Sequence, residues 1–336
     1  MKINMNKWLQ DYLAAPEKKG IPILSFPGMQ LINHSVEELV KDGHLQALCM
    51  KAIAKRFDSG AAVSLMDLSV EAEAFGCPVR YSADDVPTLH GAYIHNEEEA
   101  EALLVPHVGD GRTGECIKGI QEASQLITDR PLLAGTIGPF SLAGRLLDMT
   151  EIMILCYEEP EMVETVLEKV TEFLIEYTKA FKEAGANGIV MAEPAAGLLS
   201  PTLMDEFSTP YVRRIIDAVE DENFIVVYHN CGNITMLFDS INKVDAKAYS
   251  FGNAIDIEDA LKNVPADRMV IGNIDPAGIF RHGTPELVKS ETTSLLARCS
   301  KYSNFVISSG CDIPPVTPLE NIDAFFQAIQ DYYKAD

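Results

Sequence analysis

Short apolar segments alternate with amphipathic ones along most of the chain, and this alternation is the feature that most restricts the fold. Eight segments have the length and the β-branched and aromatic content of buried strands: Ile21–Phe26, Ala62–Asp67, Pro131–Thr136, Gly188–Glu193, Phe224–His229, Ala246–Phe251, Met269–Asn273 and Phe305–Ser309. Helical patterns lie between most of them: Ser35–Phe57, Thr150–Ala184, Ser200–Val219, Ile255–Lys262, Thr284–Ser300 and Pro318–Lys334. Eight strands that alternate with helices over 336 residues predict an α/β fold, the (β/α)8 TIM barrel.

The chain is expected to form a single domain, residues 1–336, with a helical segment ahead of the barrel. No linker rich in Pro, Gly or Ser and no sequence repeat divides it. Residues 69–106 break the alternation, and a hairpin of Val79–Tyr81 against His90–Ile94 is expected there. An insertion after the second strand would lie over the barrel mouth, where long loops usually serve the active site.

The charge and the cysteines restrict the class of protein. The formal net charge is −23, which argues against binding to nucleic acid or to an anionic membrane, since both require a basic surface. The amino-terminal residues lack the apolar core of a signal peptide, and no apolar run is long enough to span a bilayer. Seven widely spaced cysteines are therefore expected to be reduced thiols in a cytoplasmic protein, available for metal binding or catalysis.

Polar side chains gather at one predicted face of the barrel. In a TIM barrel the active site is built at the carboxyl ends of the strands. In this chain the residues at those ends are Asp67, Thr136, Glu193, His229, Cys231, Asn253, Asp275 and Cys311. The strands themselves consist mainly of Val, Ile, Leu and Ala, so the polar and metal-binding side chains are concentrated at the predicted mouth of the barrel.

His229, Cys231 and Cys311 form a candidate zinc site. Residues two apart on a strand point the same way, so His229 and Cys231 share a face. Cys311 follows another apolar strand 80 residues later, and a closed barrel would bring it near the first two. One nitrogen and two sulfurs suit Zn²⁺, and three protein ligands leave a fourth position open, as in catalytic sites. The alternative is that both cysteines are small buried apolar side chains.

Five segments of the chain resemble the uroporphyrinogen decarboxylase superfamily, and within it the zinc-dependent methyltransferases that work with corrinoid proteins. The segments that carry the resemblance are Ser64–Gly76, Gly135–Ala143, Glu193–Pro201, His229–Gly232 and Ser309–Asn321. In the methyltransferase branch the last two supply the zinc ligands. The resemblance therefore implies a TIM barrel, a Zn²⁺ ion held by His229, Cys231 and Cys311, and a corrinoid (cobalamin) carried by a partner protein.

The chain departs from the decarboxylases at positions that matter for their substrate. They carry an arginine-rich segment for the propionate groups of the porphyrinogen, whereas Ser25–His34 contains no Arg. Their Tyr after the Gly-Pro segment falls on Arg145, and their carboxyl-terminal His falls on Cys311. Decarboxylation of a uroporphyrinogen-like or smaller substrate remains the alternative function. A non-catalytic, zinc-stabilised component of a corrinoid complex is a second alternative.

Two carboxylates at the predicted mouth are candidate catalytic residues. Glu193 is expected to be a fourth zinc ligand or a proton donor to a leaving group, with an ion pair inside the barrel as the structural alternative. Asp67 matches a carboxylate of the decarboxylases, and it is alternatively expected to orient His229. Candidate substrate-binding residues are Phe26, Met29, Arg145 and Asn253, although core packing explains Phe26 and Met29 equally well.

The direction of methyl transfer is not fixed by the sequence. Zinc can hold a thiol acceptor such as coenzyme M as a thiolate that attacks the methyl group on cobalt. Alternatively, zinc can polarise a methylated donor so that Co(I) takes its methyl group. The sequence interpretation favours a methoxylated aromatic or methylamine donor, as in an O-demethylase, over coenzyme M.

Overall fold

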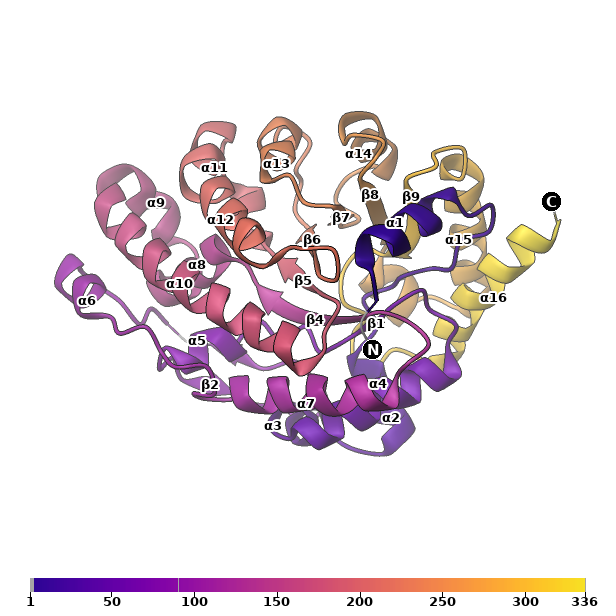
Figure 1. Cartoon of the computed structure of the whole chain (residues 1–336), viewed down its shortest axis with the longest axis horizontal. Helices are drawn as coiled ribbons and strands as arrows, with labels where there is room; N and C mark the ends of the chain where they lie inside the picture. The colour runs from indigo at the N-terminus through magenta and orange to yellow at the C-terminus, as the bar shows by residue number, and fades with distance from the viewer. Residues whose placement is uncertain (1–2, 90, 336) are drawn as a thin grey trace.

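The computed structural model describes residues 3–89 and 91–335 and is built around a seven-stranded sheet. Its strands follow the order β1-β4-β5-β6-β7-β8-β9, and each neighbouring pair is parallel. Their bounds are Ala62–Val63 (β1), Leu132–Ile137 (β4), Gly188–Ala192 (β5), Ile225–Asn230 (β6), Ala248–Phe251 (β7), Met269–Ile274 (β8) and Phe305–Ser309 (β9). The sheet is curled and helices cover its outer side (Figure 1), so the predicted TIM-barrel-like α/β fold is confirmed.

Helices form the outer layer and the connections. Their bounds are Met5–Ala14 (α1), Met29–Ile32 (α2), Val36–Lys41 (α3), Gly43–Arg56 (α4), Val70–Ala74 (α5), Glu97–Ala102 (α6), Thr113–Leu126 (α7), Pro139–Leu147 (α8), Glu151–Glu158 (α9), Pro160–Ala184 (α10), Pro201–Phe207 (α11), Thr209–Val219 (α12), Phe238–Val244 (α13), Ile257–Asn263 (α14), Pro285–Cys299 (α15) and Leu319–Ala335 (α16). Short turns of other helix types span Phe26–Gly28 (η1), Pro194–Leu198 (η2) and Pro276–Arg281 (η3). None of the helices within the described residues could cross a membrane.

Three predicted helices are each divided in two, for local reasons. Asp42 ends α3 and caps α4, because its side chain accepts hydrogen bonds from the backbone N–H groups of His44 and Leu45. Pro160 begins α10 and lacks the N–H that would continue α9. Ser208 separates α11 from α12, and Pro210 in the first turn of α12 lacks the N–H that would continue α11.

The prediction of a strand at Ile21–Phe26 is wrong, but the segment lies between β9 and β1, where the first strand of the barrel was expected. Ile21 N donates to Ile307 O of β9 at 3.0 Å, so this segment runs along one edge of the sheet. On its other side Gly60 N donates to Gly20 O at 3.0 Å, just ahead of β1. The regular ladder fails because Ile23 N bonds to the side chain of Ser309, at 3.1 Å, instead of to a backbone carbonyl. Residues 20–25 therefore bridge β9 and β1 without forming a strand.

The second predicted strand, Ala62–Asp67, is shorter than expected. β1 covers only two residues, because the Ser64 hydroxyl takes the hydrogen bond of Gly135 N at 2.8 Å in place of a backbone oxygen. The predicted hairpin exists, and β2 (Val79–Arg80) pairs with β3 (Thr88–Leu89). Its second arm thus precedes the predicted range, and His90 lies outside the described residues.

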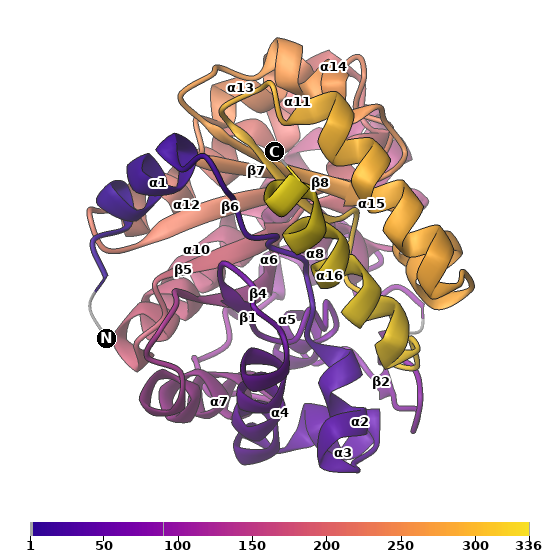
Figure 2. The ribbon, with the colours of Figure 1, turned by 90° about the vertical axis from the view of Figure 1, so that its right-hand side faces the viewer.

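The inside of the barrel holds its own apolar cluster. Alternate strand residues point inward, as Ile225 and Val227 do, whereas Val226 and Tyr228 pack on the outer helices. Met5 and Leu9 of α1 belong to the same inner cluster. Met5 N also donates to Glu222 O at 2.6 Å, ahead of β6. Helix α1, seen beside the starts of the strands in Figure 2, therefore closes the amino-terminal end of the barrel.

Candidate metal centre

The alternation of β6 points His229 into the barrel. Ile225 and Val227 face the inner cluster, so His229, the next residue in that series, faces inward at the end where β6 finishes. Cys231 follows one residue after β6 ends, and Cys311 follows two residues after β9 ends. The two strands are separated in the sheet by β7 and β8, and the curl of the sheet brings their ends together.

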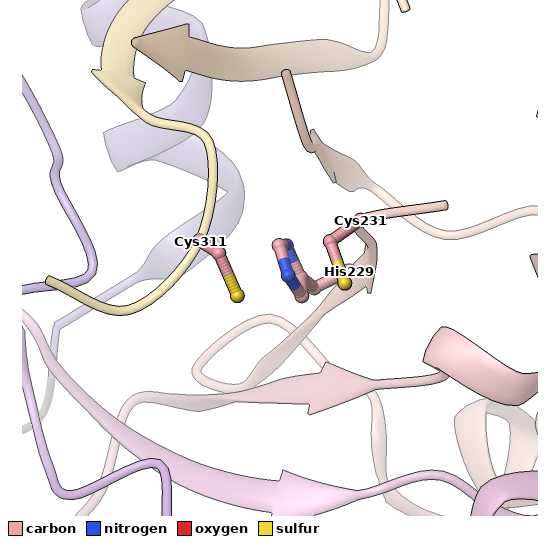
Figure 3. Close-up of side chains that lie close together, drawn as sticks. All are labelled: His229, Cys231 and Cys311. Atoms are coloured by element: carbon pink, nitrogen blue, oxygen red, sulfur yellow. The ribbon is translucent and has the colours of Figure 1, made fainter. Parts of the chain in front are cut away.

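The three predicted ligands converge. One ligand atom from each of His229, Cys231 and Cys311 lies within 4.8 Å of the other two. Cys311 approaches from the loop after β9, while His229 and Cys231 approach from the end of β6 (Figure 3). Two glycines allow this approach. A Cβ on Gly252 would lie 2.5 Å from Cys231 Cα, and one on Gly310 would lie 2.8 Å from Asn253 N.

The imidazole is oriented by one hydrogen bond. Nδ1 of His229 lies 3.0 Å from Oγ of Ser250, a buried residue of β7. The other nitrogen, Nε2, is buried and has no hydrogen-bond partner among the described residues. A buried polar atom without a hydrogen-bond partner lowers the stability of the fold unless a bound ion or water satisfies it. Nε2 is therefore suited to bind a metal, and the hydrogen bond between Nδ1 and Ser250 would set the tautomer of the imidazole.

The thiols of Cys231 and Cys311 form a hydrogen-bonded pair. A hydrogen bond with Cys311 lowers the pKa of the Cys231 thiol well below its ordinary value, and the same contact raises the pKa of Cys311. A cluster of one imidazole nitrogen and two sulfurs, with no carboxylate of the described residues in it, fits Zn²⁺ better than a hard cation such as Mg²⁺.

Glu193 lies beside this cluster and is not part of it. Its backbone N–H donates to His229 O at 2.8 Å, but its side chain turns toward the start of α8. Ser141 donates to the Glu193 carboxylate from its backbone N–H at 3.2 Å and from its hydroxyl at 3.3 Å. Burial nevertheless raises the pKa of Glu193 to about 8. Among the described residues, Glu193 is neither in the ligand cluster nor in an ion pair, so these two expectations do not hold there; a proton-transfer role stays a prediction.

Asp67 does not orient His229, so that expectation is wrong. Its carboxylate is held in a buried ion pair with Arg112 and by the hydroxyl of Ser69 at 2.6 Å. Arg112 also contacts Glu73 at 2.6 Å. The Nδ1 position at which Asp67 was expected is taken by Ser250. A catalytic role for Asp67 stays a prediction.

The four predicted substrate-binding residues lie in different settings. Phe26 and Met29 are buried in the outer core, which matches core packing. Asn253 is exposed and lies near Gly310, where an added Cβ would be 2.8 Å from the backbone N of Asn253. Arg145 is half-buried on α8 with no ion pair among the described residues. Burial lowers the pKa of Arg145, while the nearby carboxylates of Asp67 and Glu71 act in the opposite direction.

Two residues of the site were missed by sequence reasoning. Ser250 carried a usable signal, since Ala248 faces inward on β7 and a polar residue two positions later must also face inward. Ser141 follows Gly138 and Pro139, which mark a helix start whose N–H groups suit a carboxylate.

Comparison with known proteins supports the family resemblance. The chain is 30% identical over 272 residues to the methylcobamide:CoM methyltransferase MtbA of Methanosarcina acetivorans, covering 79% of this chain and 78% of that protein. It is 23% identical over 337 residues to a uroporphyrinogen decarboxylase of Hydrogenovibrio crunogenus, covering 97% and 90%. The fold matches a methyltransferase from Methanosarcina mazei with a TM-score of 0.86 at 23% identity, covering 98% and 99%.

The family pattern described as uroporphyrinogen decarboxylase (URO-D) matches residues 23–332, which is nearly the whole chain. This match begins at the segment that closes the barrel and ends in α16, and it includes all three residues of the candidate metal site. The chain therefore belongs to the uroporphyrinogen decarboxylase family, as its sequence motifs indicated.

Proposed function

We propose that this protein is a zinc-dependent methyltransferase that moves a methyl group from the cobalt of a corrinoid, carried by a partner protein, to a small thiol such as coenzyme M. The observation that carries the proposal is the cluster of His229, Cys231 and Cys311, in which the buried Nε2 of His229 has no hydrogen-bond partner among the described residues. The names of the relatives in Methanosarcina support a thiol acceptor. They favour it over the methoxylated aromatic or methylamine donor that the sequence interpretation preferred.

Zinc at this site would supply one thing: a fourth position at which the acceptor thiol loses its proton and becomes a nucleophile at neutral pH. The chain supplies the rest. His229, Cys231 and Cys311 would hold the ion at the barrel mouth, and Ser250 fixes the imidazole so that Nε2 faces it. In the transfer the sulfur–carbon bond forms, the cobalt–carbon bond breaks, and its electron pair stays on cobalt, which becomes Co(I).

Glu193 is the candidate for proton transfer near the three predicted ligands. Its carboxyl is buried, lies beside the His229 strand, and has a pKa raised to about 8 by burial, close to that of a thiol. Two donors from Ser141 hold the carboxyl in place. Since a carboxyl with this pKa is mostly protonated at neutral pH, we assign Glu193 the role of proton donor to the leaving group if the methyl group comes from a methylated donor, and the proton of an acceptor thiol passes to solvent.

The test combines metal analysis with methyl transfer. Wild-type protein is expected to contain about one zinc per chain, and Cys311→Ala to lose most of it. Cys156→Ala is the control, because Cys156 is a buried cysteine that lies on α9, outside the cluster. Zinc content that is equal in wild type and Cys311→Ala would refute the site.

Activity is measured as demethylation of methylcob(III)alamin in the presence of coenzyme M. A second reaction, with cob(I)alamin and a methoxylated phenol or a methylamine, tests the opposite direction. Transfer only in the second reaction would replace the thiol acceptor by a methylated donor. A zinc-loaded protein without transfer in either direction would favour the non-catalytic alternative, and release of CO2 from a porphyrinogen would favour the decarboxylase.

A further inference from the structure

A small cavity lies among buried side chains of the barrel wall, apart from the candidate metal centre. Its volume is about 10 Å³, which is room for a single water molecule. The helices that border it contribute Gln46 from α4, Glu71 from α5, Cys116 from α7 and Tyr177 from α10. None of the three predicted metal ligands lines it, so it is a separate site.

Two polar atoms of side chains that line this cavity have no hydrogen-bond partner among the described residues. They are Nε2 of Gln46 and Oε2 of Glu71. Both side chains are buried, at 3% and 1% exposure. Such atoms are normally satisfied by protein, water or an ion, because leaving them unpaired lowers the stability of the fold. Two of them at one small cavity therefore indicate a bound molecule.

The carboxyl group of Glu71 is fixed by its other oxygen. Oε1 accepts a hydrogen bond from the Thr136 hydroxyl at 2.8 Å and another from Ile137 N at 3.1 Å. Both donors belong to β4, so the carboxyl group is held against the end of that strand. The second oxygen, Oε2, is left for a partner that the protein itself does not supply.

The surroundings select a neutral molecule that can both donate and accept. Arg112 also lines the cavity, and its guanidinium is paired with Asp67, so a metal cation would meet a positive charge there. An anion would meet the carboxyl groups of Asp67 and Glu71. The volume excludes an organic molecule. A water molecule accepts from an amide N–H, and it can donate to a carboxylate or accept from a carboxylic acid, so it serves both protonation states of Glu71.

We propose that one water molecule is bound in this cavity, hydrogen-bonded to Nε2 of Gln46 and to Oε2 of Glu71. The water would join α4 to α5, the helix with which the inserted residues 69–106 begin. Together with the bonds from Thr136 and Ile137, it would anchor the start of that insertion to an outer helix and to the end of β4. This site is independent of the proposed methyl transfer.

The test is a crystal structure of the wild-type protein at a resolution that shows ordered water. One peak is expected within about 3.2 Å of both Nε2 of Gln46 and Oε2 of Glu71. Gln46→Met keeps the length of the side chain but removes its donor. This variant is expected to lose the peak and to unfold at a temperature a few degrees lower, because Oε2 is then left unpaired.

Thr178→Val is the matched control. The Thr178 hydroxyl is also buried without a partner among the described residues, but it does not line the cavity. This variant is expected to keep the peak. Loss of the peak in Thr178→Val as well would contradict the assignment to Gln46.

The wild-type structure decides the question even if Gln46→Met does not fold. Ordered Gln46 and Glu71 side chains with no peak between them, or with a direct hydrogen bond to each other, would overturn the proposal. So would a peak that persists in Gln46→Met, or ligand distances of about 2.0–2.4 Å, which belong to a metal ion. None of these outcomes depends on zinc or on methyl transfer, so the proposed function can fail while this site stands.

Discussion

The Nδ1 atom of His229 lies 3.0 Å from the hydroxyl of Ser250, and this contact leaves Nε2 facing Cys231 and Cys311. The hydrogen bond joins neighbouring strands, since His229 and Ser250 are directly paired in the β6–β7 register. The orientation of the imidazole is therefore set within the sheet itself, whereas Cys231 and Cys311 lie just beyond the ends of β6 and β9. It can be tested without touching a predicted ligand.

Ser250→Ala is expected to weaken zinc binding by about 10- to 100-fold, the usual effect of losing the hydrogen bond that orients a ligating histidine. Competition with a chromophoric chelator measures the affinity directly. Ser250→Thr keeps the hydroxyl and should restore most of it. An alanine variant with wild-type zinc affinity would show that Ser250 does not position His229.

Arg145→Met is expected to raise KM for coenzyme M about tenfold and to leave KM for the neutral thiol 2-mercaptoethanol unchanged. Arg145 lies one helical turn beyond Ser141 on α8, so it shares the face that reaches Glu193. A half-buried guanidinium without an ion pair among the described residues can pair with the sulfonate of the acceptor. Arg80→Met, an exposed arginine, is the control, and an equal rise for both thiols would contradict the assignment.

Glu71→Gln is expected to flatten the pH dependence of stability. Burial raises the pKa of Glu71 to about 7, above its unfolded value of about 4.3. The folded protein therefore binds the extra proton, and its free energy of unfolding falls as pH rises from about 4 to about 7. The amide can keep the hydrogen bonds from Thr136 and from Ile137 N.

At pH 8 the Gln variant should be more stable than wild type by roughly 3 kcal/mol, whereas the two should be similar near pH 4. Urea unfolding at both pH values measures this difference. Glu97→Gln, on the exposed face of α6, is the control. A constant offset between variant and wild type across this range would mean that Glu71 does not titrate there.

Gly252→Ala is expected to lower both stability and zinc content. The new methyl group would lie 2.5 Å from the Cα of Cys231, a backbone atom that cannot rotate away. Relief of that clash must move Cys231, at a cost of about 1–3 kcal/mol. Gly114→Ala, where the nearest atom is 3.3 Å away, serves as the comparison in thermal unfolding and metal analysis.

The strands and the three clustered residues could be predicted because both follow from periodicity. Apolar runs fixed β4 to β9 to within about two residues, and the spacing of two placed His229 and Cys231 on one face. The irregular course of residues 21–26, where a strand was predicted, could not be foreseen, because the side chain of Ser309 replaces a backbone acceptor there. No local sequence pattern indicates that a side-chain oxygen takes the place of a backbone carbonyl as the acceptor.

The partners of the carboxylates were the least predictable part of the site. Arg112 reaches Asp67 from a position 45 residues later, and nothing in either segment announces that pair. Glu193 was expected at the metal or in an ion pair, but the free N–H groups at the start of α8 satisfy it instead. Such contacts depend on how helices are placed around the sheet, which single-sequence patterns do not encode.

Helix α1, with Met5 and Leu9 in the inner cluster, has a consequence for the order of events. Since α1 packs against the amino-terminal end of the inner cluster, we expect a small molecule to approach Cys231 through the mouth that the corrinoid would cover. The acceptor must therefore bind before the corrinoid, and the methylated product must wait until the corrinoid departs. Steady-state kinetics with both substrates varied should show a compulsory sequence with the thiol first.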